Sequence, residues 1–184
     1  GDVIKACVYE DIDVDKLAMF DVETLFLTLR SKSVGESIDL NIKCDKCDSR
    51  NDVQISFDDI KQPVVNDEKR VIMVTDDVGI TLRYPSFKDV SLIKPGDDES
   101  IEGAMNLVVQ CIDNIFDDDG VYDAKNETKK SLTDFVESLN NEQFIRLSDF
   151  FQSSPSLSYD MEFNCVSCKE PNVQELRGLQ SFFT

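Results

Sequence analysis

The chain has 184 residues, of which 41% are hydrophobic, and its formal net charge is -18. This length fits one domain with a hydrophobic core, and the excess of acidic residues repels phosphate backbones, so we expect no nucleic-acid partner. Apolar runs fall far short of the roughly 20 residues of a membrane-spanning helix, so we expect no membrane span. The chain has no histidine and no glycine-rich phosphate motif, which argues against an enzyme.

The first part of the chain predicts one helix followed by strands. Apolar residues recur at three- and four-residue intervals over residues 15–32, which predicts a helix with Asp21 as its N-cap, ending near Gly35. Alternating and apolar stretches then predict strands at residues 37–44, 53–57, 70–75 and 80–84. The last two strands flank an Asp-Asp-Val-Gly turn and therefore predict a hairpin.

After residue 85 the pattern changes mainly to helices. Apolar periodicity predicts helices at residues 86–94, 99–111, 133–139 and 142–151, the last of them capped by Asn141. Residues 112–116 and 121–122 flank an acidic turn and predict a second hairpin, and residues 156–164 predict another strand. A final amphipathic helix is predicted around Val173, Leu176, Leu179, Phe182 and Phe183. This helix either packs in the core or presents its two phenylalanines to another chain.

Four of the six cysteines form two pairs of identical form, Cys44-Asp-Lys-Cys47 and Cys165-Val-Ser-Cys168. Each pair follows a stretch that alternates apolar and polar residues, so each strand carries its first thiol on its apolar face. Two C-x2-C turns together supply the tetrahedral all-thiolate ligand set that structural zinc favours. We therefore predict that Cys44, Cys47, Cys165 and Cys168 bind one structural Zn²⁺ and leave no open position for a catalytic water.

Other interpretations of the thiols stay open at this point. Iron takes the same four-thiolate ligand set as zinc. The pairs could instead form disulfides or pack as reduced thiols. Closely spaced pairs favour a metal over disulfides, and a chain of this size does not need disulfides. We therefore expect the protein in the reducing cytoplasm, where the thiols stay available as ligands. A redox-active pair would lie at a helix N-terminus, where neither pair is predicted. Cys7 and Cys111 stand alone in the sequence, and we interpret both as structural thiols.

The order of the predicted elements indicates an α+β fold with segregated helices and strands. Within a single domain over residues 1–184, residues 36–84 and 156–170 form a β-rich, zinc-ribbon-like part. Residues 85–155 form a mainly helical insertion between the two cysteine turns, and a C-terminal helix completes the fold. Closing so long a loop costs only a logarithmic entropy term, which the binding of structural zinc outweighs.

A basic step, Arg30-Ser31-Lys32, connects the first helix to the first cysteine strand in the sequence Leu-Phe-Leu-Thr-Leu-Arg-Ser-Lys-Ser-Val-Gly-Glu-Ser-Ile-Asp-Leu-Asn-Ile-Lys-Cys, residues 25–44. This segment resembles the baseplate hub protein family of T4-type bacteriophages, and the similarity extends over most of the chain. The resemblance implies a non-catalytic component of the central hub, or a factor that assists hub assembly. It implies other baseplate and hub proteins as partners, and a location in the host cytoplasm during assembly or in the virion tail.

The residues themselves also favour an interaction protein over an enzyme. A second class fits them too, namely a cellular zinc-ribbon adaptor that docks onto a larger protein complex. Clustered aspartates at the predicted turns form a solvated surface or attract a basic protein partner.

Overall fold

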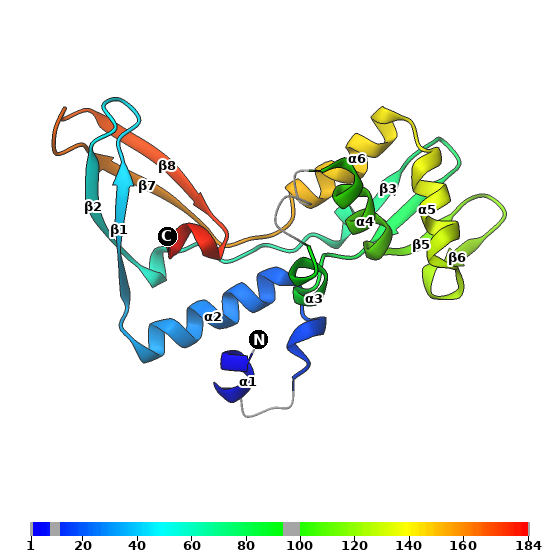
Figure 1. Cartoon of the computed structure of the whole chain (residues 1–184), viewed down its shortest axis with the longest axis horizontal. Helices are drawn as coiled ribbons and strands as arrows, with labels where there is room; N and C mark the ends of the chain where they lie inside the picture. The colour runs from blue at the N-terminus through cyan, green and yellow to red at the C-terminus, as the bar shows by residue number, and fades with distance from the viewer. Residues whose placement is uncertain (1, 8–11, 94–99, 184) are drawn as a thin grey trace. The chain divides into compact units, whose positions relative to one another are not determined.

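The structure is a computed structural model that describes residues 2–7, 12–93 and 100–183. It mixes helices and strands, which confirms the predicted α+β class (Figure 1). The chain divides into two compact units: the first comprises Gly1–Val14, Phe20–Val64 and Pro155–Thr184, and the second comprises Asp15–Met19 and Val65–Ser154. No helix in the described ranges has the length and apolar character that a membrane crossing requires. The behaviour of the whole chain as a single domain stays a prediction.

The first unit is built on two antiparallel β-hairpins from distant parts of the chain. One hairpin pairs β1 (Ser37–Lys43) with β2 (Arg50–Ser56), and the other pairs β7 (Ser158–Asn164) with β8 (Pro171–Arg177). The same unit contains α1 (Asp2–Cys7), nearly all of α2 (Met19–Ser33), and the short 3-10 helices η2 (Phe57–Asp59) and η5 (Leu179–Phe182).

The two hairpins repeat the same pattern of burial. Leu40 in β1 and Met161 in β7 occupy the same central position of their strands, and Ile55 in β2 and Leu176 in β8 occupy the same position near the ends of theirs. All four residues are buried. Because side chains alternate between the two faces of a strand, each hairpin has one apolar face and one polar face. The apolar faces share one core with residues of α2, η2 and η5.

The prediction of an amphipathic C-terminal helix is wrong, because residues 171–177 form β8 and only residues 179–182 turn into a 3-10 helix. Asn172 and Leu176 are buried while Val173 is 66% exposed. Val173, Leu176, Leu179 and Phe182 recur every three residues, which is close to the period of a helix, so the apolar pattern misled the prediction. The hydrogen-bonded partner β7 decides in favour of the strand.

The C-terminal residues pack against α2. The carboxylate of Glu23, which is buried, accepts a hydrogen bond of 3.0 Å from the backbone N–H of Leu179. Phe182 is fully buried, and the ring of Phe183 meets Phe26 edge to face at a centroid distance of 5.6 Å. Of the two predicted roles for these phenylalanines, packing in the core applies to Phe182, whereas the side chain of Phe183 is 40% exposed.

The second unit contains a four-stranded antiparallel sheet in the order β3-β4-β5-β6. These strands are β3 (Val71–Met73), β4 (Gly79–Leu82), β5 (Ile112–Phe116) and β6 (Val121–Asp123). Both predicted hairpins of this region are confirmed. However, residues 71–82 were predicted to belong to the β-rich cysteine part. They lie instead in the second unit, where β3 pairs with β4 and β4 pairs with β5.

Helices pack with this sheet to form a second core. They are α4 (Ile101–Cys111), α5 (Lys129–Ser138) and α6 (Asn141–Gln152), with the 3-10 helix η4 (Ala124–Asn126). The unit also contains α3 (Phe87–Ser91) and the 3-10 helix η3 (Asp67–Arg70), whereas η1 (Val14–Lys16) begins in the first unit and ends in the second. Ile80 and Leu82 from β4 meet Val108, Val136 and Leu147 from the helices in this core. The two cores have no residue in common.

Helix starts differ slightly from the predicted caps. Asn140, rather than Asn141, caps α6: its side chain accepts from the N–H of Gln143, whose own side chain accepts from the N–H of Asn140. This reciprocal pair is a capping box, which satisfies two N–H groups at once. Helix α2 begins at Met19, so Asp21 lies inside its first turn instead of capping it.

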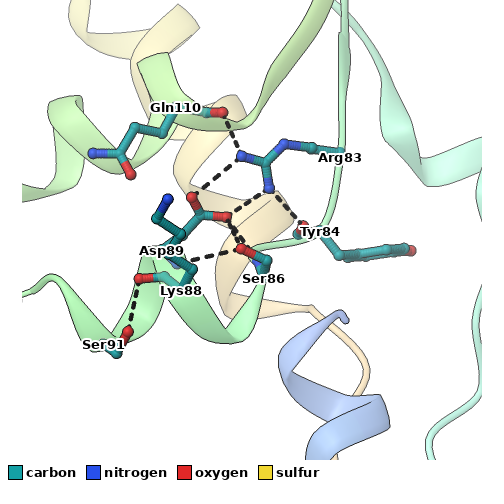
Figure 2. A network of polar contacts seen from close by, with 7 residues as sticks. All are labelled: Arg83, Tyr84, Ser86, Lys88, Asp89, Ser91 and Gln110. Atoms are coloured by element: carbon teal, nitrogen blue, oxygen red, sulfur yellow. Dashed lines mark hydrogen bonds and ion pairs between the residues drawn. The ribbon is translucent and has the colours of Figure 1, made fainter. Parts of the chain in front are cut away.

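A partly buried ion pair fixes the start of α3 (Figure 2). Arg83, just after β4, bonds to the carboxylate of Asp89 at 2.6 Å and donates to the carbonyl of Gln110 at 2.8 Å. The same carboxylate accepts from the N–H and the hydroxyl of Ser86, which caps the helix. Burial alone would raise the pKa of Asp89, but the hydrogen bonds from Arg83 and Ser86 outweigh it and lower that pKa. The network thereby joins β4, α3 and the C-terminal turn of α4.

Candidate metal centre

The tips of the two hairpins in the first unit bring four cysteine sulfurs together. Cys44 and Cys165 directly follow β1 and β7, and Cys47 and Cys168 lie in the turns that lead to β2 and β8. The four Sγ atoms all lie within 4.8 Å of one another. Cys44 and Cys168 are separated by 3.7 Å, and Cys47 and Cys165 by 3.6 Å. These distances are far longer than the roughly 2.0 Å of a disulfide bond.

The spacing of the sulfurs fits a tetrahedral metal ion. With Zn–S bonds of about 2.3 Å, tetrahedral geometry places the sulfurs about 3.8 Å apart. The two closest cross-hairpin distances, 3.6 and 3.7 Å, are near this value. An all-thiolate donor set suits zinc or iron, and four protein ligands fill a tetrahedral ion completely. An ion held by all four thiolates would therefore have no position for a reacting water.

Both cysteine turns, residues 44–49 and 165–170, have the same backbone conformation. In each turn the N–H of the first cysteine donates to the carbonyl five residues later, at 2.9 and 3.0 Å. The carbonyl of the first cysteine accepts from the N–H four residues later, at 3.0 Å in both turns. Asp48 and Lys169, at equivalent positions, have positive φ angles of 58° and 62°. Two non-glycine residues thus share a left-handed conformation that few such residues adopt.

Each turn also directs a backbone N–H toward the sulfur of its first cysteine. The donors are the residues two positions later, at 3.4 Å from Sγ in both turns. Hydrogen bonds of this kind favour the charged thiolate over the neutral thiol. Both turns therefore direct the same backbone donor toward the same sulfur position.

Two buried asparagines connect the turns across the cluster. The side-chain oxygen of Asn51 accepts from the N–H of Val166 at 2.8 Å, and that of Asn172 accepts from the N–H of Asp45 at 3.0 Å. Val166 and Asp45 each directly follow the first cysteine of the opposite turn. Asn51 and Asn172 are only 2% and 4% exposed. Each hairpin thus donates a backbone N–H to the other.

Each asparagine also binds its own turn. The amide nitrogen of Asn51 donates to the carbonyl of Ser49 at 2.9 Å, and that of Asn172 donates to the carbonyl of Glu170 at 2.9 Å. The sequence analysis did not identify these residues. A signal was nevertheless present, because both repeats have the form C-x2-C-x3-N.

The hydroxyl of Ser49 lies between two sulfurs, 3.0 Å from Cys47 and 3.1 Å from Cys165. Its hydrogen bond lowers the pKa of Cys47 and, with backbone N–H groups, lowers the pKa of Cys165 to about 5. A backbone hydrogen bond from Glu170 favours the thiolate of Cys168, but burial and the neighbouring sulfurs raise its pKa to about 12. Thiols packed this closely cannot all ionise easily unless a cation balances their charge.

The remaining two cysteines lie outside the cluster. Cys111, at the end of α4, is fully buried, and burial raises its pKa to about 12. Cys7, at the end of α1, is exposed. Of the lysines next to the cluster, Lys169 donates its ammonium group to the carbonyl of Val166 at 2.8 Å.

Comparisons with known proteins address the identity of the chain. The family model described as T4 bacteriophage base plate protein matches residues 1–184, the whole length of the sequence. A search of curated proteins and a search of solved structures each gave no match. The resemblance noted in the sequence is thus confirmed at the level of the family. This chain belongs to the T4 bacteriophage base plate protein family.

Proposed function

We propose that this protein is a non-catalytic part of the central hub of the phage baseplate, or a factor needed for hub assembly, stabilised by a structural Zn²⁺. Family membership supports the baseplate role. The observation that carries the metal is the convergence of Cys44, Cys47, Cys165 and Cys168 from two distant hairpins. The protein acts by contacts with other baseplate and hub proteins, in the host cytoplasm during assembly or in the virion tail.

The first unit has a clear structural need for a cross-link. It consists of three separate stretches of chain, and each of its sheets has only two strands in the described residues. An isolated two-stranded hairpin is marginally stable in water. A bound Zn²⁺ supplies a cross-link, and structural zinc contributes on the order of 10 kcal/mol in small domains. The four thiolates would hold the ion while Asn51 and Asn172 keep the two turns in register.

The chemistry of the cysteine cluster favours a protein that acts by binding other proteins over an enzyme. Four sulfur ligands leave a tetrahedral ion without an open position, and the chain contains no histidine to act as a base near neutral pH. The alternative of a cellular zinc-ribbon adaptor has no comparable support, because the family match covers the whole chain.

Metal analysis of the purified protein tests the site. We expect about one zinc per chain, as a four-thiolate site holds one ion. Each of Cys44→Ser, Cys47→Ser, Cys165→Ser and Cys168→Ser should lose the metal and unfold the first unit at a lower temperature. Cys7→Ser is the matched control, since Cys7 is exposed and lies outside the cluster. A metal-free protein with unchanged stability in all four variants would refute the metal site, and iron in place of zinc would correct its identity.

Complex formation tests the baseplate role. The full chain is mixed with the purified hub proteins of the same phage and analysed by size-exclusion chromatography. We expect co-elution with at least one hub protein, and we expect the Cys165→Ser variant to bind more weakly if the first unit forms the contact. Absence of co-elution with every hub protein would contradict the proposed function.

A further inference from the structure

The last row of the four-stranded sheet presents apolar side chains to solvent. The strand register places these four residues side by side, one from each strand: Met73, Gly79, Phe116 and Val121. The preceding row, with Ile72, Ile80 and Ile115, packs into the core of the unit. Because neighbouring residues of a strand point to opposite faces, the last row lies on the face away from that core. Met73 is 42% exposed and Val121 is 71% exposed.

Phe116 makes this row continuous. A Cβ atom added at Gly79 would overlap the ring of Phe116, so the ring lies directly over the glycine backbone. The aromatic ring thereby covers the position where β4 has no side chain. An apolar strip extends from Met73 on one edge strand to Val121 on the other.

The apolar strip is bordered by acidic turns. The β3–β4 turn contains Asp76 and Asp77, and the β5–β6 turn contains the run of residues 117–119, all aspartates. Both turns directly follow the last row, so they lie at the same end of the sheet. None of these aspartates forms an ion pair with another residue that the structure describes. The guanidinium of Arg146 donates to the carbonyl of Met73 at 3.2 Å, which places one cation at the strand β3.

The negative charges of the β5–β6 turn also change the pKa of a side chain in the sheet. The charge of Asp117, followed by burial and the charge of Asp119, raises the pKa of Tyr122 in β6. Asp117 also accepts the N–H groups of Asp119 and Gly120, which holds the turn in place. The carboxylate of Asp117 is therefore held within the β5–β6 turn, next to the apolar strip.

We propose that this strip, Met73, Gly79, Phe116 and Val121, is a docking face for a basic segment of another baseplate protein. The segment places an apolar side chain against Phe116 and directs Lys or Arg side chains to the two acidic turns. Charge complementarity selects this occupant, since a second copy of the chain would bring the same aspartates and a net charge of -18 to the contact. The proposal rests on the proposed function only in taking its partner from the baseplate.

Peptide binding tests the docking face. Overlapping peptides from the baseplate proteins of the same phage are arrayed and probed with the full chain, and binders are measured in solution by fluorescence anisotropy. We expect the binders to carry an apolar residue flanked by Lys or Arg. The double variant Met73→Ser/Val121→Ser should weaken binding by roughly tenfold or more, as expected for central apolar contacts. Asp76→Asn/Asp77→Asn/Asp118→Asn/Asp119→Asn should slow association and reduce its dependence on salt.

Matched controls separate this face from general effects of charge and hydrophobicity. Val173→Ser removes an equally exposed valine from β8, and Asp58→Asn/Asp59→Asn neutralises an exposed acidic pair in η2. Both controls should keep the affinity of the parent protein. The proposal is refuted if basic peptides do not bind, if the controls weaken binding equally, or if sedimentation shows that the face joins two copies of the chain. Hub co-elution that persists in the docking variants would refute this face alone and leave the proposed function intact.

Discussion

Asn51 and Asn172 hold the two cysteine turns together through the same hydrogen bonds, made in opposite directions across the cluster. Each also binds the carbonyl two residues before it in its own turn. These bonds connect side chains to backbone and do not involve the sulfurs. The two hairpins therefore have a metal-independent means of fixing the relative positions of the four thiols.

Removal of either asparagine should destabilise the first unit. Asn51→Ala and Asn172→Ala each remove two hydrogen bonds made by a buried side chain, one from a backbone N–H and one to a backbone carbonyl. At about 0.5–1.5 kcal/mol for each bond, the loss is about 1–3 kcal/mol in the free energy of unfolding. We also expect metal affinity to fall about tenfold or more, as for other groups that orient metal ligands. Urea unfolding and competition with a chelator measure the two effects. The control Asn41→Ala, on the exposed side of β1, should change stability by no more than about 0.5 kcal/mol.

The ion pair of Arg83 and Asp89 should make stability depend on pH. The folded pKa of Asp89 is lowered below its ordinary value of 3.8, so its carboxylate stabilises the fold above that pH. This contribution is lost as the pH falls through the lower folded pKa. We expect Asp89→Asn to cost about 1–3 kcal/mol near neutral pH and progressively less below pH 3.8.

Urea unfolding of the parent and of Asp89→Asn across this pH range gives the difference between their free energies of unfolding. The effects of other acidic groups are the same in both proteins and cancel in this difference. The exposed Asp59→Asn variant is the control and should show no such trend. A stability difference that stays constant, or that grows in acid, would contradict the assigned role of the ion pair.

The two isolated cysteines should differ strongly in reactivity. Cys111 is fully buried, and its pKa is raised to about 12, so little thiolate is present or accessible near pH 8. Cys7 is exposed. Treatment of the folded protein with iodoacetamide, followed by mass spectrometry of peptides, should show rapid labelling of Cys7 and labelling of Cys111 only in denaturant. Equal rates in the folded protein would show that α4 does not protect its last residue.

Gly79 should tolerate no side chain while Phe116 keeps its position. Gly79→Ala brings a methyl group into the Phe116 ring, and overpacking of this kind costs about 1–3 kcal/mol. In a Phe116→Ala background the same change should be nearly neutral, and a double-mutant cycle by urea unfolding measures this coupling. Gly120→Ala is the control, since an added Cβ there meets nothing within 4 Å. A cost at Gly79 that is independent of Phe116 would place its cause in the backbone.

The cysteine cluster could be predicted because its signal is local. Period-two alternation ending in a C-x2-C turn occurs twice, and each copy specifies a strand, a face and two ligands without knowledge of the other. The predicted hairpins at residues 70–84 and 112–122 rest on equally local turn residues. In all these cases the observed strands differ from the predicted strands mainly in the residues at which they begin and end.

The parts that could not be predicted depend on contacts between distant residues. The apolar spacing within residues 173–183 fits a helix, and only the pairing with β7 identifies residues 171–177 as a strand. The β3–β4 hairpin belongs to the second unit because β4 pairs with β5, which begins about thirty residues later in the sequence. No local pattern indicates this long-range pairing. Asn51 and Asn172 acquire a role only when the two turns meet.

The division of the first unit between distant stretches of chain has a consequence for biosynthesis. Its second hairpin is translated after the whole of residues 65–154, so the ribosome completes the inserted unit first. Until Cys165 emerges, Cys44 and Cys47 belong to a nascent hairpin that holds half of the cysteine cluster. A polypeptide released prematurely would consequently expose an unclosed pair of thiols, which distinguishes it chemically from the finished product.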